Sequence, residues 1–236
     1  MKNAKIIQAG AVKQAARGIL LGKWRRHVAV TAVILMGMTA IPMVTGLFGP
    51  GLPASAMSLL AGIIMEMLVG LLVDGGFFYC LHMADGTEAA LNDVFAPYRL
   101  QPDRFLIAEL IRVAACTVPM LPSLLILFLS RDPLSLKWLM TALCIIGVFL
   151  SLLIRLALSF TPFLLLRDGT KGAIAAVRES LRLTRPHLLR LLLFALSFAG
   201  YLVLGIVTGS VGFLWIIPYY MLSLTLYYIE ACENPL

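Results

Sequence analysis

Long apolar stretches separated by short polar segments run along most of the sequence. Each apolar stretch holds about the 20 residues that a helix needs to cross the hydrocarbon core of a membrane. A segment inside that core has to satisfy its own backbone hydrogen bonds, and an α-helix does so. The pattern therefore predicts an all-α, polytopic membrane protein. Its six expected transmembrane helices cover residues 27–48, 56–83, 105–129, 138–166, 188–207 and 213–229.

The first 26 residues have a different pattern, in which basic and apolar residues are mixed. Seven of these residues are basic: Lys2, Lys5, Lys13, Arg17, Lys23, Arg25 and Arg26. Such a segment suits an amphipathic helix that lies among the lipid headgroups. Residues 54–56 resemble a signal-peptide cleavage site, but the apolar run before them is about twice the usual length. We therefore expect an uncleaved chain with two parts, a cytoplasmic interfacial segment over residues 1–26 and a transmembrane domain over residues 27–236.

Basic residues are unevenly distributed between the two ends of the predicted helices. Fifteen Lys and Arg residues lie on the side of the amino terminus, in residues 1–26, in the loop 83–104 and around the loop 167–190. The opposite side has only Arg131 and Lys137. Because cytoplasmic loops are enriched in Lys and Arg, we expect both termini in the cytoplasm.

The composition agrees with this prediction and excludes a soluble domain. Of the 236 residues, 61% are hydrophobic and 13% are charged, whereas a soluble domain has about 45–50% apolar and about 25% charged residues. The net charge of +7 does not indicate a nucleic-acid partner, because the basic residues lie in short clusters beside the apolar stretches. The four cysteines form no CxxC pair, and we interpret them as small buried hydrophobic residues.

The tripeptide Asp-Gly-Thr occurs twice, at residues 85–87 and again 83 positions later at residues 168–170. With this offset, the hairpin of the second and third predicted helices aligns with the hairpin of the fourth and fifth. Both hairpins would cross the membrane in the same direction, so the match predicts a parallel repeat. Coincidence between two apolar hairpins is the alternative. At each tripeptide Gly permits a turn and a side-chain oxygen can cap the start of the next helix. The predicted caps are Asp85, Thr87, Asp168 and Thr170.

The segment after the second tripeptide has the pattern of an amphipathic helix. Ile174, Val177 and Leu181 recur at helical spacing and form its apolar side. A basic stripe lies on the opposite side and consists of Lys171, Arg178, Arg182 and Arg185. Two interpretations remain open for this basic stripe. It is either a solvated face that fixes the topology, or a surface that recognises anionic lipid headgroups or an acidic cytosolic partner.

Five charged residues lie inside the predicted transmembrane helices: Glu66, Asp74, Glu109, Arg112 and Arg155. Because an unpaired charge is costly there, we expect these side chains to face one another or a wet cavity. Asp74, Arg112 and Arg155 lie at a similar depth. We therefore predict an ionic cluster in which Asp74 pairs with Arg155 or Arg112 and Glu109 supports Arg112. The cluster either joins the helices or forms a path for a polar substrate or for protons.

The sequence contains no convincing catalytic or nucleotide-binding motif. His27, His82 and His187 do not have the spacing of metal ligands, and Walker-type, GxSxG and GxGxxG motifs are missing. We therefore expect no enzymatic activity, no metal site and no cofactor.

Three motifs in the last third of the chain are typical of a known family. They are GAIAAVRESLRL before the fifth predicted helix, LSFAGYLVLGIVTGSVGFLWIIPYY across the fifth and sixth, and LYYIE near the end. Through them the chain resembles the bacterial integral membrane family called domain of unknown function 975 (DUF975). It departs from that family at SFTPFLLLRDG, where a Pro-Gly-Ile-type segment is usual. The resemblance implies a polytopic membrane fold and brings no established activity or catalytic residues.

Together these patterns predict a non-enzymatic, multi-pass protein of the bacterial cytoplasmic (inner) membrane, acting as a scaffold or accessory factor in membrane or envelope processes. The expected partners are membrane lipids, among them anionic headgroups, and either a membrane-protein partner or a second copy of the chain. The alternative is a small transporter or transporter subunit that uses the intramembrane charges as a polar site. A membrane-embedded enzyme comes third.

Overall fold

The computed structural model describes residues 9–22, 24–47, 52–129 and 137–233, and every regular element in these ranges is a helix. The α-helices are α1 (Ala9–Leu20), α2 (Trp24–Gly46), α3 (Leu52–Ala84), α4 (Ala96–Arg99), α5 (Pro102–Thr117), α6 (Leu121–Leu129), α7 (Lys137–Ala157), α8 (Thr161–Arg167), α9 (Ala173–Thr184), α10 (Leu188–Leu196), α11 (Ala199–Val207) and α12 (Phe213–Glu233). Short 3-10 helices lie between them: η1 (Leu91–Phe95), η2 (Val118–Met120) and η3 (Arg185–His187). The predicted all-α class is confirmed.

Five helical stretches in the described residues are long and apolar enough to cross a membrane: Trp24–Gly46, Leu60–Ala84, Pro102–Ser123, Lys137–Arg167 and Ala173–Val207. They contain or overlap the first five predicted transmembrane helices. The sixth predicted helix corresponds to α12. This helix is 21 residues long and is not one of the five stretches; it contains four tyrosines, a proline and two glutamates.

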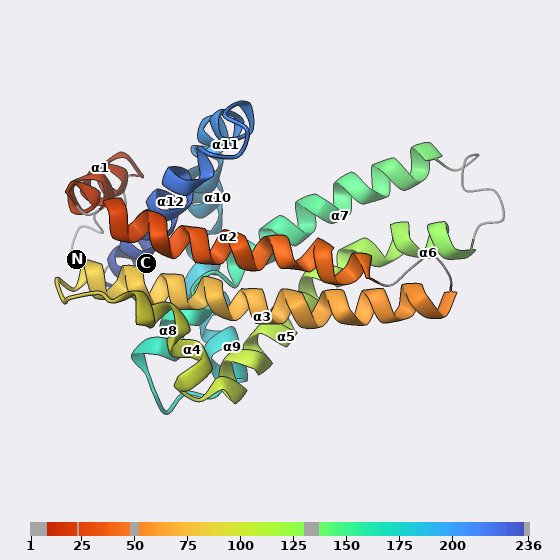
Figure 1. Ribbon diagram of the computed structural model, residues 1–236, viewed down its shortest axis with the longest axis horizontal. Helices are drawn as coiled ribbons and strands as arrows, with labels where there is room; N and C mark the ends of the chain where they lie inside the picture. The colour runs from red at the N-terminus through yellow and green to blue at the C-terminus, as the bar shows by residue number, and fades with distance from the viewer. Residues whose placement is uncertain (1–8, 23, 48–51, 130–136, 234–236) are drawn as a thin grey trace.

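The long helices are arranged as two hairpins that extend in the same direction. α2 packs along α3, while α5 and α6 with η2 between them pack along α7. Figure 1 shows both hairpins extending away from the end of the molecule where α1, α10, α11 and α12 lie. Small residues let α2 and α3 approach closely, since a Cβ at Gly37 would lie 2.9 Å from Leu72 Cδ1. Between the same two helices, the Ser58 hydroxyl donates a hydrogen bond to the Thr45 carbonyl (3.2 Å).

α12 is a central helix of the core and contacts α1, α2 and α3. The ring of Tyr228 stacks on Phe163 of α8 with the ring centroids 4.6 Å apart. Tyr227 lies against Phe194 of α10 at 5.2 Å. Such aromatic pairs contribute about 0.5–1.5 kcal/mol beyond the burial of their area. Because protein surrounds so much of α12, this helix does not need the apolar surface of a helix that faces lipid.

The end of α7 is stabilised by hydroxyl groups of α9. The Ala157 carbonyl lies where α7 ends, and three residues separate it from the start of α8. It accepts hydrogen bonds from the hydroxyls of Ser180 (3.0 Å) and Thr184 (2.8 Å). A carbonyl at the end of a helix lacks a partner in its own helix, and an apolar bundle offers it no water. Ser180 and Thr184 supply the missing hydrogen bonds.

Thr184→Val is expected to lower the free energy of unfolding by about 1 kcal/mol, because it removes one of these hydrogen bonds and keeps the shape of the side chain. Unfolding in mixed micelles of SDS and a mild detergent would measure the loss. Thr141→Val is the matched control, since the exposed Thr141 hydroxyl bonds to the Lys137 carbonyl of its own helix. Equal losses in the two variants would contradict a special role for Thr184.

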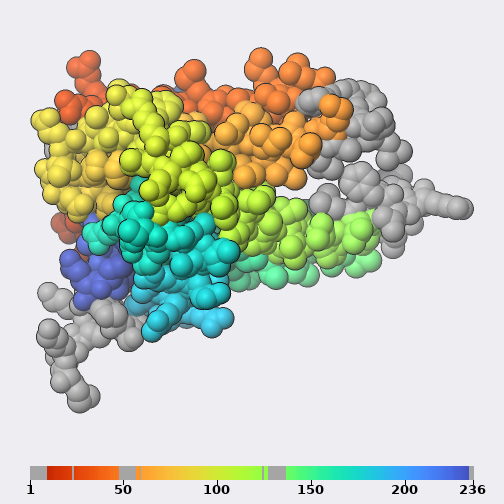
Figure 2. Space-filling view, turned by 90° about the horizontal axis from the view of Figure 1, so that it is seen from below, coloured from red at the N-terminus to blue at the C-terminus, as the bar shows by residue number. Residues whose placement is uncertain are grey.

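The segments that follow the two Asp-Gly-Thr tripeptides have different structures. After the first come η1 and α4, and after the second comes α9. η1 lies tightly against α3, since a Cβ at Gly75 would be only 1.8 Å from the Val94 carbonyl oxygen. Figure 2 shows α9, in cyan, on the face of the molecule that also presents η1 and α4, in yellow-green. The sequence match at the 83-residue offset therefore does not extend to this part of the local structure.

The apolar face of α1 packs against α12. Val12, Ala16 and Leu20 recur every four residues, are buried, and belong to a helix that packs on α12. One face of the predicted interfacial segment is therefore covered by α12, and the position of α1 among the lipid headgroups stays a prediction. Part of the predicted interfacial segment lies outside the described residues, namely residues 1–8, with Lys2 and Lys5, and also Lys23.

Candidate functional site

A buried ionic cluster joins α3 to α5 and consists of Asp74, Glu109 and Arg112. The Arg112 guanidinium donates hydrogen bonds to Asp74 Oδ1 (3.0 Å) and, from Nε, to Glu109 Oε2 (3.1 Å). The side chains of Asp74 and Glu109 are only 2% and 3% exposed. A Cβ at Gly70 would lie 2.5 Å from the Glu109 carboxyl, so the glycine makes room for this group. The cluster therefore balances two carboxylates against one guanidinium in a buried place.

The other two intramembrane charges form a separate ion pair. Arg155 of α7 donates a hydrogen bond to Glu66 Oε1 of α3 (2.7 Å), and the two side chains are 58% and 43% exposed. The expected single cluster was therefore wrong, because the described residues form two groups with no ion pair between them. Of the two partners predicted for Asp74, the structure gives Arg112.

The pair of Glu66 and Arg155 lines a cavity of about 590 Å³ beside α3, α5 and α7. Other polar groups in its lining include Thr117 and Ser151, together with the thiol of Cys116. The Ser151 hydroxyl donates a hydrogen bond to the Cys116 carbonyl (2.7 Å), which joins α7 to the end of α5. This cavity can hold water or a small polar molecule next to a pair of opposite charges.

α9 has one buried face and one exposed face, and the exposed face carries both apolar and basic residues. Small residues form the buried face and pack on the protein: Ala173, Ala176, Ser180 and Thr184. Two of the predicted apolar residues, Ile174 and Leu181, are exposed, and Ile174 is 63% exposed. Three members of the basic stripe, Arg178, Arg182 and Arg185, are exposed as well. The helix therefore offers both an apolar and a basic surface to whatever covers it.

Lys171 differs from the rest of the basic stripe because it has carboxylate partners. Its ammonium lies 2.5 Å from Glu179 Oε2 and 3.8 Å from Asp168 Oδ2. The hydrogen bond with Glu179 raises the pKa of Lys171 above its ordinary value. The charge of Lys171 is thus partly neutralised within the protein, and the outward-facing positive charge comes from Arg178 and Arg182 of α9 and from Arg185, the first residue of η3.

The predicted caps close local turns and do not start the next helix. The Thr87 hydroxyl donates a hydrogen bond to the His82 carbonyl at the end of α3 (2.8 Å). Asp168 accepts hydrogen bonds from the hydroxyl and backbone N–H of Thr170 (2.7 and 3.1 Å), and these bonds lower the pKa of the Asp168 carboxyl. The residues that precede η1 and α9 are Ala90 and Gly172, and neither side chain caps a helix. The prediction that Asp85, Thr87, Asp168 and Thr170 cap the following helices was therefore wrong.

The sequence did not predict that Arg104 binds the loop at the second Asp-Gly-Thr tripeptide, residues 168–172. Its guanidinium donates hydrogen bonds to the carbonyls of Gly169 (2.6 Å) and Lys171 (2.7 Å). The planar guanidinium fork suits two neighbouring oxygen acceptors. The first turn of α5 thereby fixes the loop before α9. No sequence pattern could identify this contact, because backbone carbonyls have no signature in a sequence.

A smaller polar contact lies at the first loop. His82 Nδ1 lies 3.0 Å from Asp93 Oδ2, and the same oxygen accepts a hydrogen bond from the Ala90 N–H (2.9 Å).

In the described ranges, no group of three or more His, Cys, Asp or Glu side chains is placed to hold a metal ion.

Comparisons with known proteins give one match. The family described as "Protein of unknown function (DUF975)" matches residues 7–234, which is nearly the whole chain. No curated protein and no solved structure matches the chain. The match includes the motif that forms α9 and the motif that forms α11 and the start of α12. The chain therefore belongs to the DUF975 family.

Proposed function

We propose that this protein is a non-enzymatic membrane scaffold or accessory factor that contacts anionic lipid headgroups through α9. The observation behind this proposal is the division of α9 into faces. Its small residues bind it to the protein, while Ile174, Leu181 and the three arginines face outward. An apolar strip beside a basic strip matches the boundary between acyl chains and anionic headgroups.

The proposed topology has six transmembrane helices and both termini in the cytoplasm of a bacterium. Besides the five apolar stretches, α12 supplies the sixth crossing, since its 21 residues extend about 32 Å at 1.5 Å per residue. The exposed arginines of α9 then lie on the cytoplasmic side, where anionic lipids attract basic segments. The buried cluster supports a structural role, because Arg112 is bonded to both carboxylates and joins α3 to α5.

Photo-crosslinking from α9 in native membranes tests the lipid contact. A crosslinking side chain at position 174 is expected to form lipid adducts enriched in anionic lipids, compared with the same side chain at the exposed position 207 of α11. Each basic residue near an anionic surface contributes about 1 kcal/mol. Replacing Arg178, Arg182 and Arg185 together with glutamine should therefore remove most of this enrichment.

Two results would contradict this proposal. Adducts of the same lipid composition at positions 174 and 207 would exclude recognition of anionic headgroups. A single protein adduct from position 174, unaffected by loss of the arginines, would replace the lipid surface with a protein partner.

A small transporter is the second candidate, and the cavity of Glu66 and Arg155 is the observation that favours it. Half-exposed charges of opposite sign beside polar groups are typical of a path for a polar solute. Cys144 lines this cavity and is exposed. Two results together would favour transport. A membrane-impermeant maleimide would label Cys144 rapidly in intact cells, and this labelling would be slower in the Glu66→Gln variant. Failure to label Cys144 would favour the scaffold.

A further inference from the structure

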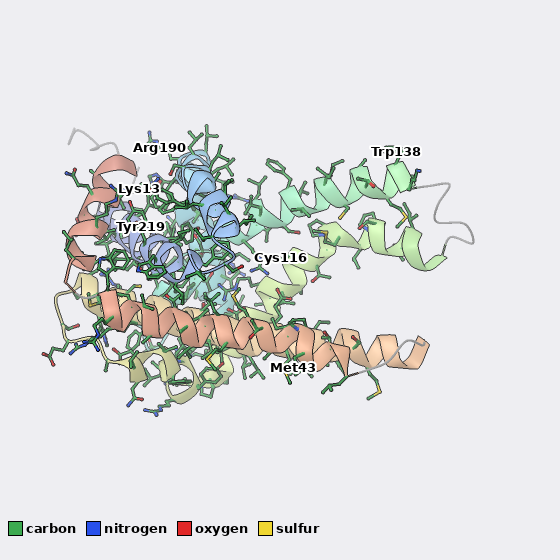
Figure 3. All side chains as sticks on the ribbon, turned by 45° about the horizontal axis from the view of Figure 1, so that its top comes forward. Lys13, Met43, Cys116, Trp138, Arg190 and Tyr219 are labelled. Carbon is green, nitrogen blue, oxygen red and sulfur yellow. The ribbon has the colours of Figure 1, made fainter. Side chains whose placement is uncertain are left out.

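Two cations of α1 lie on aromatic side chains of α11, of α12 and of Phe198, the residue before α11. Lys13 Nζ is 4.1 Å from the centroid of the Phe198 ring and donates a hydrogen bond to the Ser197 carbonyl (3.1 Å). Figure 3 shows Lys13 close to Tyr219, and the Tyr219 hydroxyl donates to the Lys13 backbone carbonyl (3.4 Å). α1 is therefore fixed to α12 by polar contacts as well as by its buried apolar face.

Arg17 lies one helical turn after Lys13, at the edge of the same aromatic group. Its guanidinium donates a hydrogen bond to the Tyr201 hydroxyl (2.8 Å) and lies 5.4 Å from the centroid of the Tyr219 ring. Within the described residues, neither Lys13 nor Arg17 forms a salt bridge with a carboxylate. Burial, followed by the charge of Arg17, lowers the pKa of Lys13. A guanidinium has five N–H donors, so Arg17 can bind an anion and keep its bond to Tyr201.

A cavity of about 540 Å³ opens beside Arg17 between α1, α2, α11 and α12. Apart from Arg17 its lining is almost entirely apolar and aromatic, and includes Leu21, Trp24, Leu204 and Trp215. Leu21, Leu204 and Trp215 are exposed, although they lie beside helices of the membrane bundle. Tryptophan and tyrosine are enriched at the level of the headgroups. A volume of this size is typical of a site for one small molecule, since such pockets measure about 300–1,000 Å³.

We propose that this cavity binds one anionic phospholipid molecule. An acyl chain lies along Leu21, Leu204 and the two tryptophans, and the phosphate binds Arg17, with the positive charge of Lys13 one turn away. Charge complementarity decides the occupant, because Arg17 lines an otherwise apolar cavity, has no carboxylate partner among the described residues, and lies one helical turn from Lys13. The site is distinct from the surface of α9, and its occupancy does not depend on the headgroup contact proposed there.

Native mass spectrometry of the whole detergent-solubilised chain tests this site. The probes are phosphatidylglycerol and phosphatidylcholine with identical acyl chains. We expect one phosphatidylglycerol to bind about tenfold more tightly than phosphatidylcholine, because phosphatidylglycerol has a net negative charge, whereas the choline cation of phosphatidylcholine is repelled by Arg17 and Lys13. Arg17→Gln should abolish this preference. Leu204→Trp should weaken the binding of both lipids, because the larger ring fills the cavity.

Arg99→Gln is the matched control, since it removes an exposed arginine of α4 that belongs neither to the lining of this cavity nor to the basic stripe, and it should leave the phosphatidylglycerol preference unchanged. The thermal unfolding temperature of each variant shows whether it is folded. Tyr201→Phe is a further variant, which removes only the hydroxyl that accepts a hydrogen bond from Arg17. Equal binding of the two lipids by the unaltered protein would overturn the proposal. Equal losses in Arg17→Gln and Arg99→Gln would overturn it as well, and neither result would affect the crosslinking experiment at position 174.

Discussion

Arg112→Leu is expected to cost about 3–5 kcal/mol of stability, because it leaves the carboxylates of Asp74 and Glu109 buried without their cation. Both carboxylates are almost fully covered and both accept hydrogen bonds from Arg112. Asp74→Asn should have a much smaller effect, since it removes the excess negative charge and keeps an oxygen that accepts from Arg112. SDS titration in mixed micelles would measure both losses.

A charge-neutral combination provides the control for this prediction. Arg112→Leu together with Asp74→Asn and Glu109→Gln contains no buried charge, so it should recover much of the stability lost in Arg112→Leu. Arg155→Leu is a matched comparison, because the half-exposed Glu66 that it leaves behind can reach solvent. If Arg155→Leu were as destabilising as Arg112→Leu, the difference in burial would not determine the effect.

Gly75→Ala is expected to destabilise the protein by about 3 kcal/mol or more, at the upper end of the effects of overpacking. The added methyl group would lie 1.8 Å from the Val94 carbonyl oxygen. The obstacle is backbone, so no side-chain rotation can relieve it, and η1 has to move away from α3. Alanine favours a helix over glycine by about 1 kcal/mol, which is too little to offset the clash. Unfolding by SDS and the rate of proteolysis in the loop 85–100 should both report the change.

Gly200→Ala is the control for Gly75→Ala. Gly200 also lies within a helix, α11, but a Cβ there would meet no atom within 4 Å. This variant should be neutral or more stable by up to about 1 kcal/mol. A similar loss of stability at both positions would show that close packing of η1 on α3 is not the cause.

The sequence predicted the positions of the helices well, because apolar stretches of membrane length and the residues that end them are local signals. The fifth predicted helix, residues 188–207, begins where α10 begins and ends where α11 ends. The charged residues inside the bundle were also recognisable, since ionisable residues are rare at such positions. Residues 213–229 were predicted as an ordinary span, whereas α12 is surrounded largely by protein. Hydropathy does not distinguish a central helix from a peripheral one.

The contacts between helices could not be predicted, because they depend on how each helix is rotated about its axis. Depth alone left two partners for Asp74, and the rotation of α5 decides in favour of Arg112. On α9, the sequence pattern indicated Ile174, Val177 and Leu181 as the apolar side, but it did not indicate which residues contact the rest of the protein. The protein contacts the small residues, whose hydroxyls at Ser180 and Thr184 reach the Ala157 carbonyl. Arg17 and the aromatic cavity were missed because their residues come from four distant helices.

The packing of α1 on α12 affects the order in which this protein can mature during synthesis. Of the helices described here, α1 leaves the ribosome first and α12 leaves it last. Val12, Ala16 and Leu20 therefore cannot pack on α12 until the intervening chain has been translated. The inserted hairpins also lack their central aromatic helix until that moment. A ribosome stalled before residue 213 therefore presents a nascent chain with an open interior, and completion of the fold coincides with completion of the last helix.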